Sequence, residues 1–485
     1  MNYGQFLNMV PEFYLVCILL VVFFADFFLH RRTDKHNILY GLTIGLMVVL
    51  PVRIALMSEP AEAFGGMYVA SAMANVMKVI LTAGTVIVLI MAEPWVKNEA
   101  RKNEGEFLML VISTLLGMYI MVSSGNFLMF FLGLETASVP MACLVAFDKM
   151  KKQSAEAAAK YILTATFSSG VMLYGISFLY GITGTLYFDD MAQAISQCDS
   201  WTSEWAMLIA GLVFFFSGLG FKLSLVPFHF WTADTYQGAP TPVTGYLSVI
   251  SKGAAALALC IILTKVFGSM FEYWQVLLGT VIVLTITIGN LFAIRQSELK
   301  RFMAFSSISQ AGYIMLAVMG DPTMGVTALT YYVLVYVAAN MAVFTVINVV
   351  EQNGGNSLMS CYNGFYQTNP KLSFLMTLAL FSLAGIPPFA GMFSKFFVFM
   401  AAVGGHESAP FWVYLVVFIA LINTVVSLYY YLLIVKAMYI TKTDSPLPTF
   451  KSDCWTRTAL ALCTAGVALF GIASCIYSWI AQAAA

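Results

Sequence analysis

The sequence predicts an all-α polytopic membrane protein with about 14 transmembrane helices, arranged as two inverted repeats that each contain a proline-broken helix. Three observations predict this fold class. Of 485 residues, 60% are hydrophobic and 10% are charged, with a mean hydropathy of +0.84, whereas soluble domains carry about 25% charged residues. The apolar residues form long runs, and prolines interrupt two of these runs close to lysines. No loop is long enough for a soluble domain, so residues 1–485 are predicted to form a single transmembrane domain.

A helix that spans a bilayer needs about 20 predominantly apolar residues. By this criterion, spans are predicted at 8–29, 37–57, 69–92, 106–123, 126–148, 156–183, 205–230, 241–266, 273–294, 301–319, 324–350, 371–402, 411–440 and 458–481. The first run lacks a preceding basic region and a small-residue cleavage site. We therefore expect it to be a retained span and not a signal peptide.

Basic residues follow the odd-numbered spans. The loops after spans one, three, five and nine read HRRTDKH (30–36), KNEARKNEGE (97–106), DKMKKQ (148–153) and RQSELKR (295–301), and Lys442, Lys451 and Arg457 follow span thirteen. The even-numbered loops are nearly free of Lys and Arg, with Arg53 at the end of span two as the main exception. The positive-inside rule then predicts odd loops in the cytoplasm and both termini on the outer, periplasmic side.

Two breaks divide the chain into similar halves. The first is LSLVPF (223–228), and the second lies in SLAGIPPFAGMFSKFF (382–397). The predicted topology gives the two broken spans opposite directions, as expected for an inverted repeat. The predicted parts are N-terminal helices (1–105), a first repeat (106–266) broken near 223–229, a second repeat (273–441) broken near 384–389, and a C-terminal helix (442–485).

Two ionisable residues stand out in the first half. Glu135 lies in the middle of its span, and Lys222 lies immediately before the first break. Charged side chains at membrane depth are costly and usually mark an ion or proton pathway. A carboxylate near a buried lysine favours the charged amine, so a Glu135–Lys222 couple could take up and release a proton. The alternative is a purely structural, hydrogen-bonded role for each residue.

Four further residues are candidates for the same pathway. Lys252 lies mid-span among small residues, which admit close helix approach or water, and Lys395 follows the second break. Lys160 lies near the cytoplasmic end of span six, where a lysine can also extend its ammonium to the membrane surface. His229 follows the first break and could shuttle protons near neutral pH, or it could simply terminate a helix.

Other charged residues lie near predicted span ends. We expect Asp26, Lys78, Asp148, Lys265 and Lys436 to be interfacial anchors. Lys300 and Arg301 begin span ten, where a solvated, orientation-setting role is at least as plausible as a functional one.

The cysteine pattern does not indicate a metal or redox site. The eight cysteines are scattered and never form CxxC, whereas iron–sulfur and zinc sites need clustered ligands. No nucleotide-binding glycine motif follows a predicted strand. Any redox cofactor is therefore expected on another chain, and the formal net charge of zero argues against nucleic acid.

Several motifs resemble one family. GFKLSLVPFHFWTADTYQGAPTPV (220–243) is similar to the antiporter-like subunits of respiratory complex I, and its YQGAP element (236–240) resembles one subunit branch in particular. The resemblance extends through FLGLETASVP (131–140), SAEAAAKYILTA (154–165), LKRFMAFSSISQAGY (299–313) and SLAGIPPFAGMFSKF (382–396). It covers most of the chain, and it implies fourteen core helices with two inverted five-helix repeats.

The resemblance also implies roles for individual residues. Glu135 corresponds to the modulating acid, Lys222 and Lys160 to its partner lysines, Lys252 to the central relay and Lys395 to the lysine on the exit side. There are two departures from the family pattern. Ala233 replaces a usual proline after the Trp-Thr pair, and Gln310 stands where relatives often have a histidine. A glutamine orients water but does not take up a proton near neutral pH, which puts a histidine step at that position in doubt.

Together these features predict a proton-translocating subunit of an NADH–quinone oxidoreductase in a bacterial inner membrane. NADH, FMN, iron–sulfur clusters and quinone are then expected on partner membrane and peripheral subunits, with the lipid bilayer as the other partner. The alternatives are a subunit of a multisubunit cation/proton antiporter, a subunit of a membrane-bound hydrogenase-type complex, or a mainly structural connector.

Overall fold

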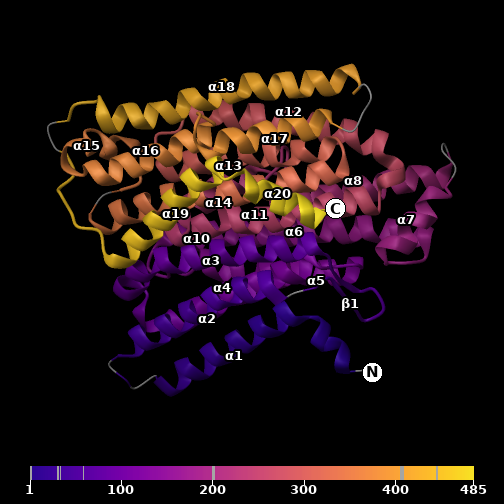
Figure 1. The fold of residues 1–485 in the computed structure, drawn as a ribbon, viewed down its shortest axis with the longest axis horizontal. Helices are drawn as coiled ribbons and strands as arrows, with labels where there is room; N and C mark the ends of the chain where they lie inside the picture. Colours follow the sequence, from indigo (N-terminus) through magenta and orange to yellow (C-terminus); the bar gives the residue numbers. More distant parts are fainter. Residues whose placement is uncertain are drawn as a thin grey trace.

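The computed structural model describes residues 3–29, 32, 34–57, 59–198, 202–354, 356–404, 409–443 and 446–484, and it is almost entirely helical (Figure 1). In these ranges, 13 helical stretches are long and apolar enough to cross a membrane. The two shorter apolar helices α16 and α17 together form one more, interrupted span. The predicted fold class, an all-α polytopic membrane protein with about 14 spans, is therefore confirmed.

The long helices follow the predicted spans closely. They are α1 (Val10–Leu29), α2 (Lys35–Met57), α3 (Ala72–Glu99), α4 (Glu104–Val122), α5 (Phe127–Val145), α6 (Lys152–Thr183), α8 (Ser203–Leu223), α11 (Lys252–Lys265), α12 (Phe271–Ile294), α13 (Leu299–Leu316), α14 (Pro322–Gln352), α16 (Pro370–Ala384), α17 (Ala390–Val403), α18 (Phe411–Tyr439) and α19 (Cys454–Ile472). Short helices are α7 (Phe188–Ser196), α9 (Phe230–Gly238), α10 (Thr241–Tyr246), α15 (Phe365–Thr368) and α20 (Ser474–Ala484).

Several short elements were not predicted. A two-stranded antiparallel hairpin pairs β1 (Ala61–Ala63) with β2 (Tyr68–Ala70). A π-helical turn, η3 (Leu247–Ser251), separates α10 from α11 within one span. The 3₁₀ turns are η1 (Tyr3–Asn8), η2 (Arg101–Asn103), η4 (Gly268–Met270), η5 (Ala317–Met319) and η6 (Met359–Tyr362). Such short segments lack the long apolar period that identifies a span.

The long helices lie roughly side by side, so the molecule has two ends (Figure 1). We call the end that carries α15 the inner end, and the end that carries α7 and β1 the outer end. The inner end corresponds to the predicted cytoplasmic loops.

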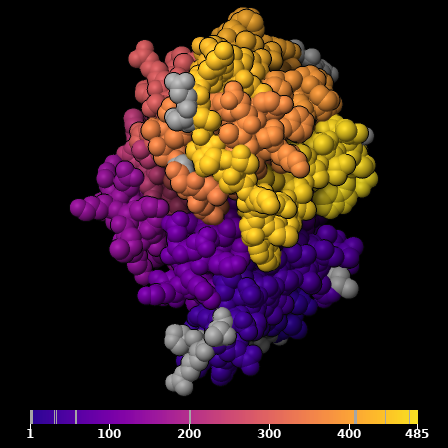
Figure 2. All heavy atoms as spheres, turned by 90° about the vertical axis from the view of Figure 1, so that its left-hand side faces the viewer, coloured from indigo at the N-terminus to yellow at the C-terminus, as the bar shows by residue number. Residues whose placement is uncertain are grey.

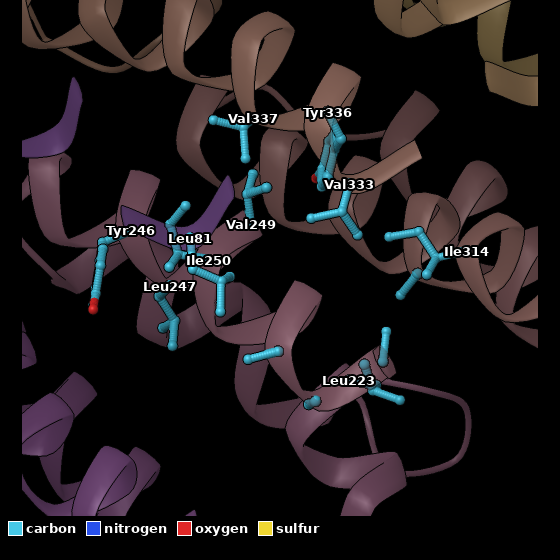
Figure 3. Packing of buried hydrophobic residues seen from close by; sticks show 14 of the residues in the cluster. Leu81, Leu223, Tyr246, Leu247, Val249, Ile250, Ile314, Val333, Tyr336 and Val337 are labelled. Carbon is cyan, nitrogen blue, oxygen red and sulfur yellow. The ribbon is translucent and has the colours of Figure 1, made fainter. Parts of the chain in front are cut away.

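Four spans form the centre of the bundle. The buried share of residues is 100% in the membrane-length window of α13, 94% in α14, 89% in the span Thr241–Lys265 that contains α10 and α11, and 83% in α3. The values for α1, α6 and α18 are 22%, 28% and 33%. The first four spans therefore make up the core, and the last three helices face outward. Figure 3 shows Leu247, Val249 and Ile250 of the π-helical turn packed among Leu81 of α3 and Val333 and Val337 of α14.

Helices α4 and α5 approach each other unusually closely. A Cβ atom added to Gly117 of α4 would lie 2.3 Å from the backbone nitrogen of Ala137 in α5, and one added to Gly133 would lie 2.5 Å from that of Met121. Glycine is therefore needed at both contacts, as is common where membrane helices pack closely. This packing fixes α5, the helix that carries Glu135.

The first break separates α8 from α9. Ser224 ends α8 in the left-handed conformation, with φ of 63°. The Leu225 amide then donates to the Gly220 carbonyl at 2.8 Å, which satisfies an acceptor left free at the helix end. The Val226–Pro227 peptide bond is cis.

The second break has the same construction. Gly385 ends α16 with φ of 89°, and the Ile386 amide donates to the Phe381 carbonyl at 3.0 Å. The Pro387–Pro388 bond is cis. Both predicted breaks are thus present. The inverted relation of the two halves, and the parts drawn at 106–266 and 273–441, remain predictions.

Candidate functional site

Three of the buried lysines lie in the interior of the bundle beside irregular backbone. Lys222 lies in the last turn of α8 before the first break, Lys252 follows the π-helical turn, and Lys395 lies on α17 after the second break. Their exposed fractions are 4%, 1% and 4%. The structure shows no ion pair to any of them within the described residues.

Lys222 is held by hydroxyl groups. Its ammonium donates to Ser138 Oγ of α5 at 2.8 Å and to the Tyr161 hydroxyl of α6 at 3.5 Å. Glu135 lies one helical turn from Ser138 on α5, and its carboxylate accepts a hydrogen bond of 2.5 Å from Ser169 Oγ. Glu135 and Lys222 therefore lie on neighbouring positions around Ser138 without direct contact.

An aromatic cluster leads from Lys222 to Lys252. The ring centroids of Tyr161 and Trp231 are 5.2 Å apart, and those of Trp231 and Tyr236 are 6.5 Å apart. The Lys252 ammonium is 5.7 Å from the centroid of the Tyr236 ring. An aromatic face stabilises a nearby cation without supplying a negative charge.

Helix α13 supplies the next partner. Lys252 donates to Ser307 Oγ at 2.8 Å, and the same hydroxyl lies 3.3 Å from the Tyr236 hydroxyl. Behind it, Asn340 of α14 donates to Ser248 Oγ of the π-helical turn at 2.6 Å. Lys252 is thus fully enclosed by neutral polar groups and apolar side chains.

Gln310 lies one turn after Ser307 on α13 and joins the second break. Its amide donates to the Leu383 carbonyl at 3.3 Å and to the Tyr431 hydroxyl at 3.2 Å, and it accepts from the Tyr332 hydroxyl. Gln310, whose side chain is neutral, thus makes these contacts at the position where the related proteins often have a histidine.

Lys395 completes the series. It donates to the Ala384 carbonyl at 3.0 Å, and its ammonium lies 4.9 Å from the centroid of the Tyr313 ring. The Ala384 carbonyl is at the end of α16, where the helix leaves acceptors free. Gln310, Tyr332, Ser394 and Lys395 line one small space.

Lys160 lies in a different setting. Its side chain is 45% exposed and forms ion pairs of 2.7 Å with Glu156 and with Asp234 of α9. Arg301 of α13 donates to the other oxygen of Asp234, also at 2.7 Å. The structure does not bring Lys160 into contact with Glu135 or Lys222. The role of Lys160 stays a prediction.

His229 precedes α9 and is 7% exposed. Its Nδ1 has no hydrogen-bond partner in the described part of the chain, and its ring packs against Phe230 with centroids 4.5 Å apart. It does not touch any of the three buried lysines.

One prediction about a span end is wrong. Lys78 was expected to be interfacial, but it is 0% exposed and forms a 2.6 Å ion pair with Glu12 of α1. The Tyr68 hydroxyl donates to the same carboxylate at 2.7 Å. For Lys300, a solvated and a functional role were both left open; it is buried, donates to the Ala239 carbonyl at 2.9 Å and lies 3.8 Å from a carboxylate oxygen of Glu351.

A second buried cluster was missed altogether. His36 of α2 lies with Nδ1 2.6 Å from Glu104 and Nε2 3.0 Å from Glu93, and all three side chains are buried. Beside them, Lys35 pairs with Asp26 at 2.7 Å. These residues are polar positions near the ends of four separate spans. Sequence alone does not reveal that they converge.

Sequence comparison finds a matching family and similar proteins. Residues 124–426 match the family described as NADH:quinone oxidoreductase/Mrp antiporter, TM. The NADH-quinone oxidoreductase subunit N of Phocaeicola vulgatus is 56% identical, with 100% of each chain covered. The protein of the same name from Azobacteroides pseudotrichonymphae is 48% identical over 99% of this chain and 98% of its own.

Solved structures give the same fold. A chain of respiratory complex I from Thermus thermophilus is 28% identical, with a TM-score of 0.77 over 95% of this chain and 97% of its own. A chain of the Mrp complex from Dietzia is 19% identical, with a TM-score of 0.83 over 100% of this chain and 97% of its own. This last likeness concerns the fold alone.

The Glu12–Lys78 pair generates a test of stability. Lys78→Met leaves a buried carboxylate unpaired, which is expected to destabilise the chain by about 3–5 kcal/mol. The double variant Glu12→Leu/Lys78→Met removes both charges and should recover most of this loss. The measurement is thermal unfolding of the purified protein in detergent.

Lys265→Met is the matched control, because Lys265 forms an exposed ion pair with Asp189. An exposed pair contributes about 0–1 kcal/mol, so this variant should unfold near the wild-type temperature. Wild-type stability of Lys78→Met would contradict the importance of the buried pair.

Proposed function

Because the chain belongs to the NADH:quinone oxidoreductase/Mrp antiporter family, we propose that it is a proton-translocating membrane subunit of an NADH–quinone oxidoreductase. The observation that carries this proposal is the series of three buried lysines, which have no ionic partner among the residues that the structure describes and are joined by hydroxyl, amide and aromatic side chains. The relatives named subunit N provide the link to this particular oxidoreductase.

The proposed pathway follows the contacts in order. A proton enters near Glu135 and Lys222, passes Tyr161 and Tyr236 to Lys252, and continues along α13 past Gln310 to Lys395. Each lysine in this series is hydrogen-bonded to a neutral oxygen. When such a lysine releases its proton, the neutral amine that remains leaves no buried carboxylate unpaired. Small changes in hydration or in a neighbouring charge can then shift the proton from one lysine to the next.

The remaining candidates have supporting roles in this proposal. Glu135 modulates Lys222 through the shared Ser138 region. Lys160, with Asp234 and Arg301, forms a charged group that lies on α6, α9 and α13. His229 is an entry-side residue whose buried Nδ1 has no hydrogen-bond partner among the described residues. Gln310 holds the chain of hydrogen bonds between α13 and the second break without titrating itself.

Proton movement is proposed to be driven from other subunits. NADH oxidation, FMN, the iron–sulfur clusters and quinone reduction belong to partner chains of the complex. The energy they release alters the charge or hydration around Glu135 and Lys222. The inner end faces the cytoplasm in this proposal, so protons move from the Lys222 side toward Lys395 and the periplasm. The division into two inverted repeats, 106–266 and 273–441, describes the two half-channels.

The second candidate function is a subunit of a multisubunit cation/proton antiporter, favoured by the fold likeness to the Mrp complex chain. A subunit of a membrane-bound hydrogenase-type complex is a further alternative function. Isolation in mild detergent distinguishes these functions. Association with flavin and iron–sulfur chains is expected for the oxidoreductase, whereas sodium-dependent proton exchange without such chains would favour the antiporter.

Replacement of Lys222 tests the pathway. In the assembled enzyme, Lys222→Ala is expected to lower NADH-driven proton pumping at least tenfold, which corresponds to about 1.4 kcal/mol in a barrier. The measurement is acidification of inverted membrane vesicles, normalised to the amount of assembled complex. Full pumping stoichiometry in this variant would refute the assignment.

Substitutions of two other lysines serve as controls for the Lys222 variant. Lys160→Ala removes exposed ion pairs worth about 0–1 kcal/mol, so its effect should stay below about fivefold. Lys265→Ala changes a lysine paired with Asp189 on the surface and should leave pumping unchanged.

Natural cysteines test the proposed orientation. Cys454 begins α19 at the inner end, Cys475 lies on α20, and both are exposed in the chain. A membrane-impermeant maleimide should label Cys454 in inverted vesicles and spare it in intact spheroplasts. Peptide mass spectrometry identifies the labelled residue, and labelling of Cys454 in intact spheroplasts would reverse the predicted topology.

A further inference from the structure

A groove between α16 and α19 at the inner end is outside the lysine pathway. It has a volume of about 870 Å³ and is walled by Leu372 and Leu375 of α16 and by Leu460, Ala465 and Ala468 of α19. The small side chains on α19 leave room along the helix. The groove is therefore long enough and apolar enough to accept hydrocarbon.

Three basic side chains line the same groove. Lys371 lies in the first turn of α16, Lys451 in the connection before α19, and Arg457 in the first turn of α19. All three are exposed, and none forms an ion pair within the described ranges. Arg457 Nε donates to Ser452 Oγ at 3.4 Å. The acid beside them is Asp453, so the described part of this mouth has a net positive charge.

The backbone at two helix N-termini adds to the positive charge at the mouth of the groove. Both α16 and α19 begin at the groove, and neither has a side chain capping its N-terminus. A helix N-terminus carries partial positive charge and unpaired amide groups. The cationic residues and the two helix ends thus point to an anion at the mouth.

A polar group also lies within the groove. The Thr464 hydroxyl is buried and has no hydrogen-bond partner in the described residues. It lies seven residues after Arg457, or about 10 Å further along α19. A buried hydroxyl without a partner is unfavourable.

From these features, we propose that the groove between α16 and α19 binds an anionic phospholipid of the inner leaflet. The phosphate lies among Lys371, Lys451 and Arg457, and an acyl chain descends along the alanine side of α19. A free phosphate would satisfy the cations but leave the apolar walls uncovered. Figure 2, which views the molecule from the left-hand side of Figure 1, shows the C-terminal yellow segment lying against orange segments at this end.

The test uses the intact complex in nanodiscs of phosphatidylcholine that contain a trace of phosphatidylglycerol with a photoreactive acyl chain. After irradiation, mass spectrometry locates the labelled peptides. Labelling of α16 and α19 is expected. The variant Lys371→Gln/Lys451→Gln/Arg457→Gln should reduce it at least about tenfold, since each basic residue contributes to anionic-lipid attraction.

A matched control changes three other basic residues. Lys97→Gln/Arg101→Gln/Lys102→Gln alters exposed cations of a different inner loop and should leave labelling of the groove unchanged. Ala465→Trp keeps the charges but fills the groove, and should also reduce labelling. A photoreactive phosphatidylcholine should label the outward-facing α18 equally in all variants, which verifies their folding.

Three outcomes would overturn the proposal. Labelling that is unchanged by the charge substitutions would show that the lipid is not held as an anion. Displacement of the lipid by inorganic phosphate at constant ionic strength would indicate a simple phosphate site. Absence of groove labelling in the wild-type complex would show that a neighbouring subunit fills it.

Discussion

The cost of placing a lysine inside a membrane protein governs much of this structure. An ammonium group removed from water needs hydrogen-bond acceptors, yet an ordinary helix uses its own carbonyl groups. Lys222 and Lys395 lie beside interrupted helices, and Lys252 follows a π-helical turn. At Lys395 the break supplies the acceptor directly, because Ala384 is the last residue of α16. The irregular backbone is thus part of how the charge of Lys395 is accommodated, whereas Lys222 and Lys252 donate to side-chain hydroxyl groups.

Buried charges fall into two groups that differ in their partners. Lys78 and His36 in the N-terminal helices lie against carboxylates, within compact clusters. The lysines of the central series contact hydroxyl, carbonyl and aromatic groups instead. Removing a proton from the first group would leave negative charge in the interior, whereas the second group avoids this penalty. The N-terminal clusters are therefore suited to holding helices together, and the central series is suited to proton exchange.

The sequence was sufficient for the fold class because a bilayer imposes a minimum apolar length on each span, and because proline disrupts a helix in a recognisable way. It also identified Glu135, Lys222, Lys252 and Lys395 as unusual. It did not show that Ser138 stands between the first two, since hydroxyl residues are common in membrane helices. Lys78 was misplaced because hydropathy gives the position along a span and not which neighbouring helices cover it.

The π-helical turn has a consequence for the direction of Lys252. Such a turn contains one residue more than an α-helical turn, and each residue advances an α-helix by about 100°. Everything after η3 is therefore rotated by about that angle relative to a continuous helix from α10. The contact between Lys252 and Ser307 depends on this angular offset. A helical wheel drawn through the whole span would place Lys252 on the wrong side of the helix. The faces of α10 and α11 must therefore be assigned separately.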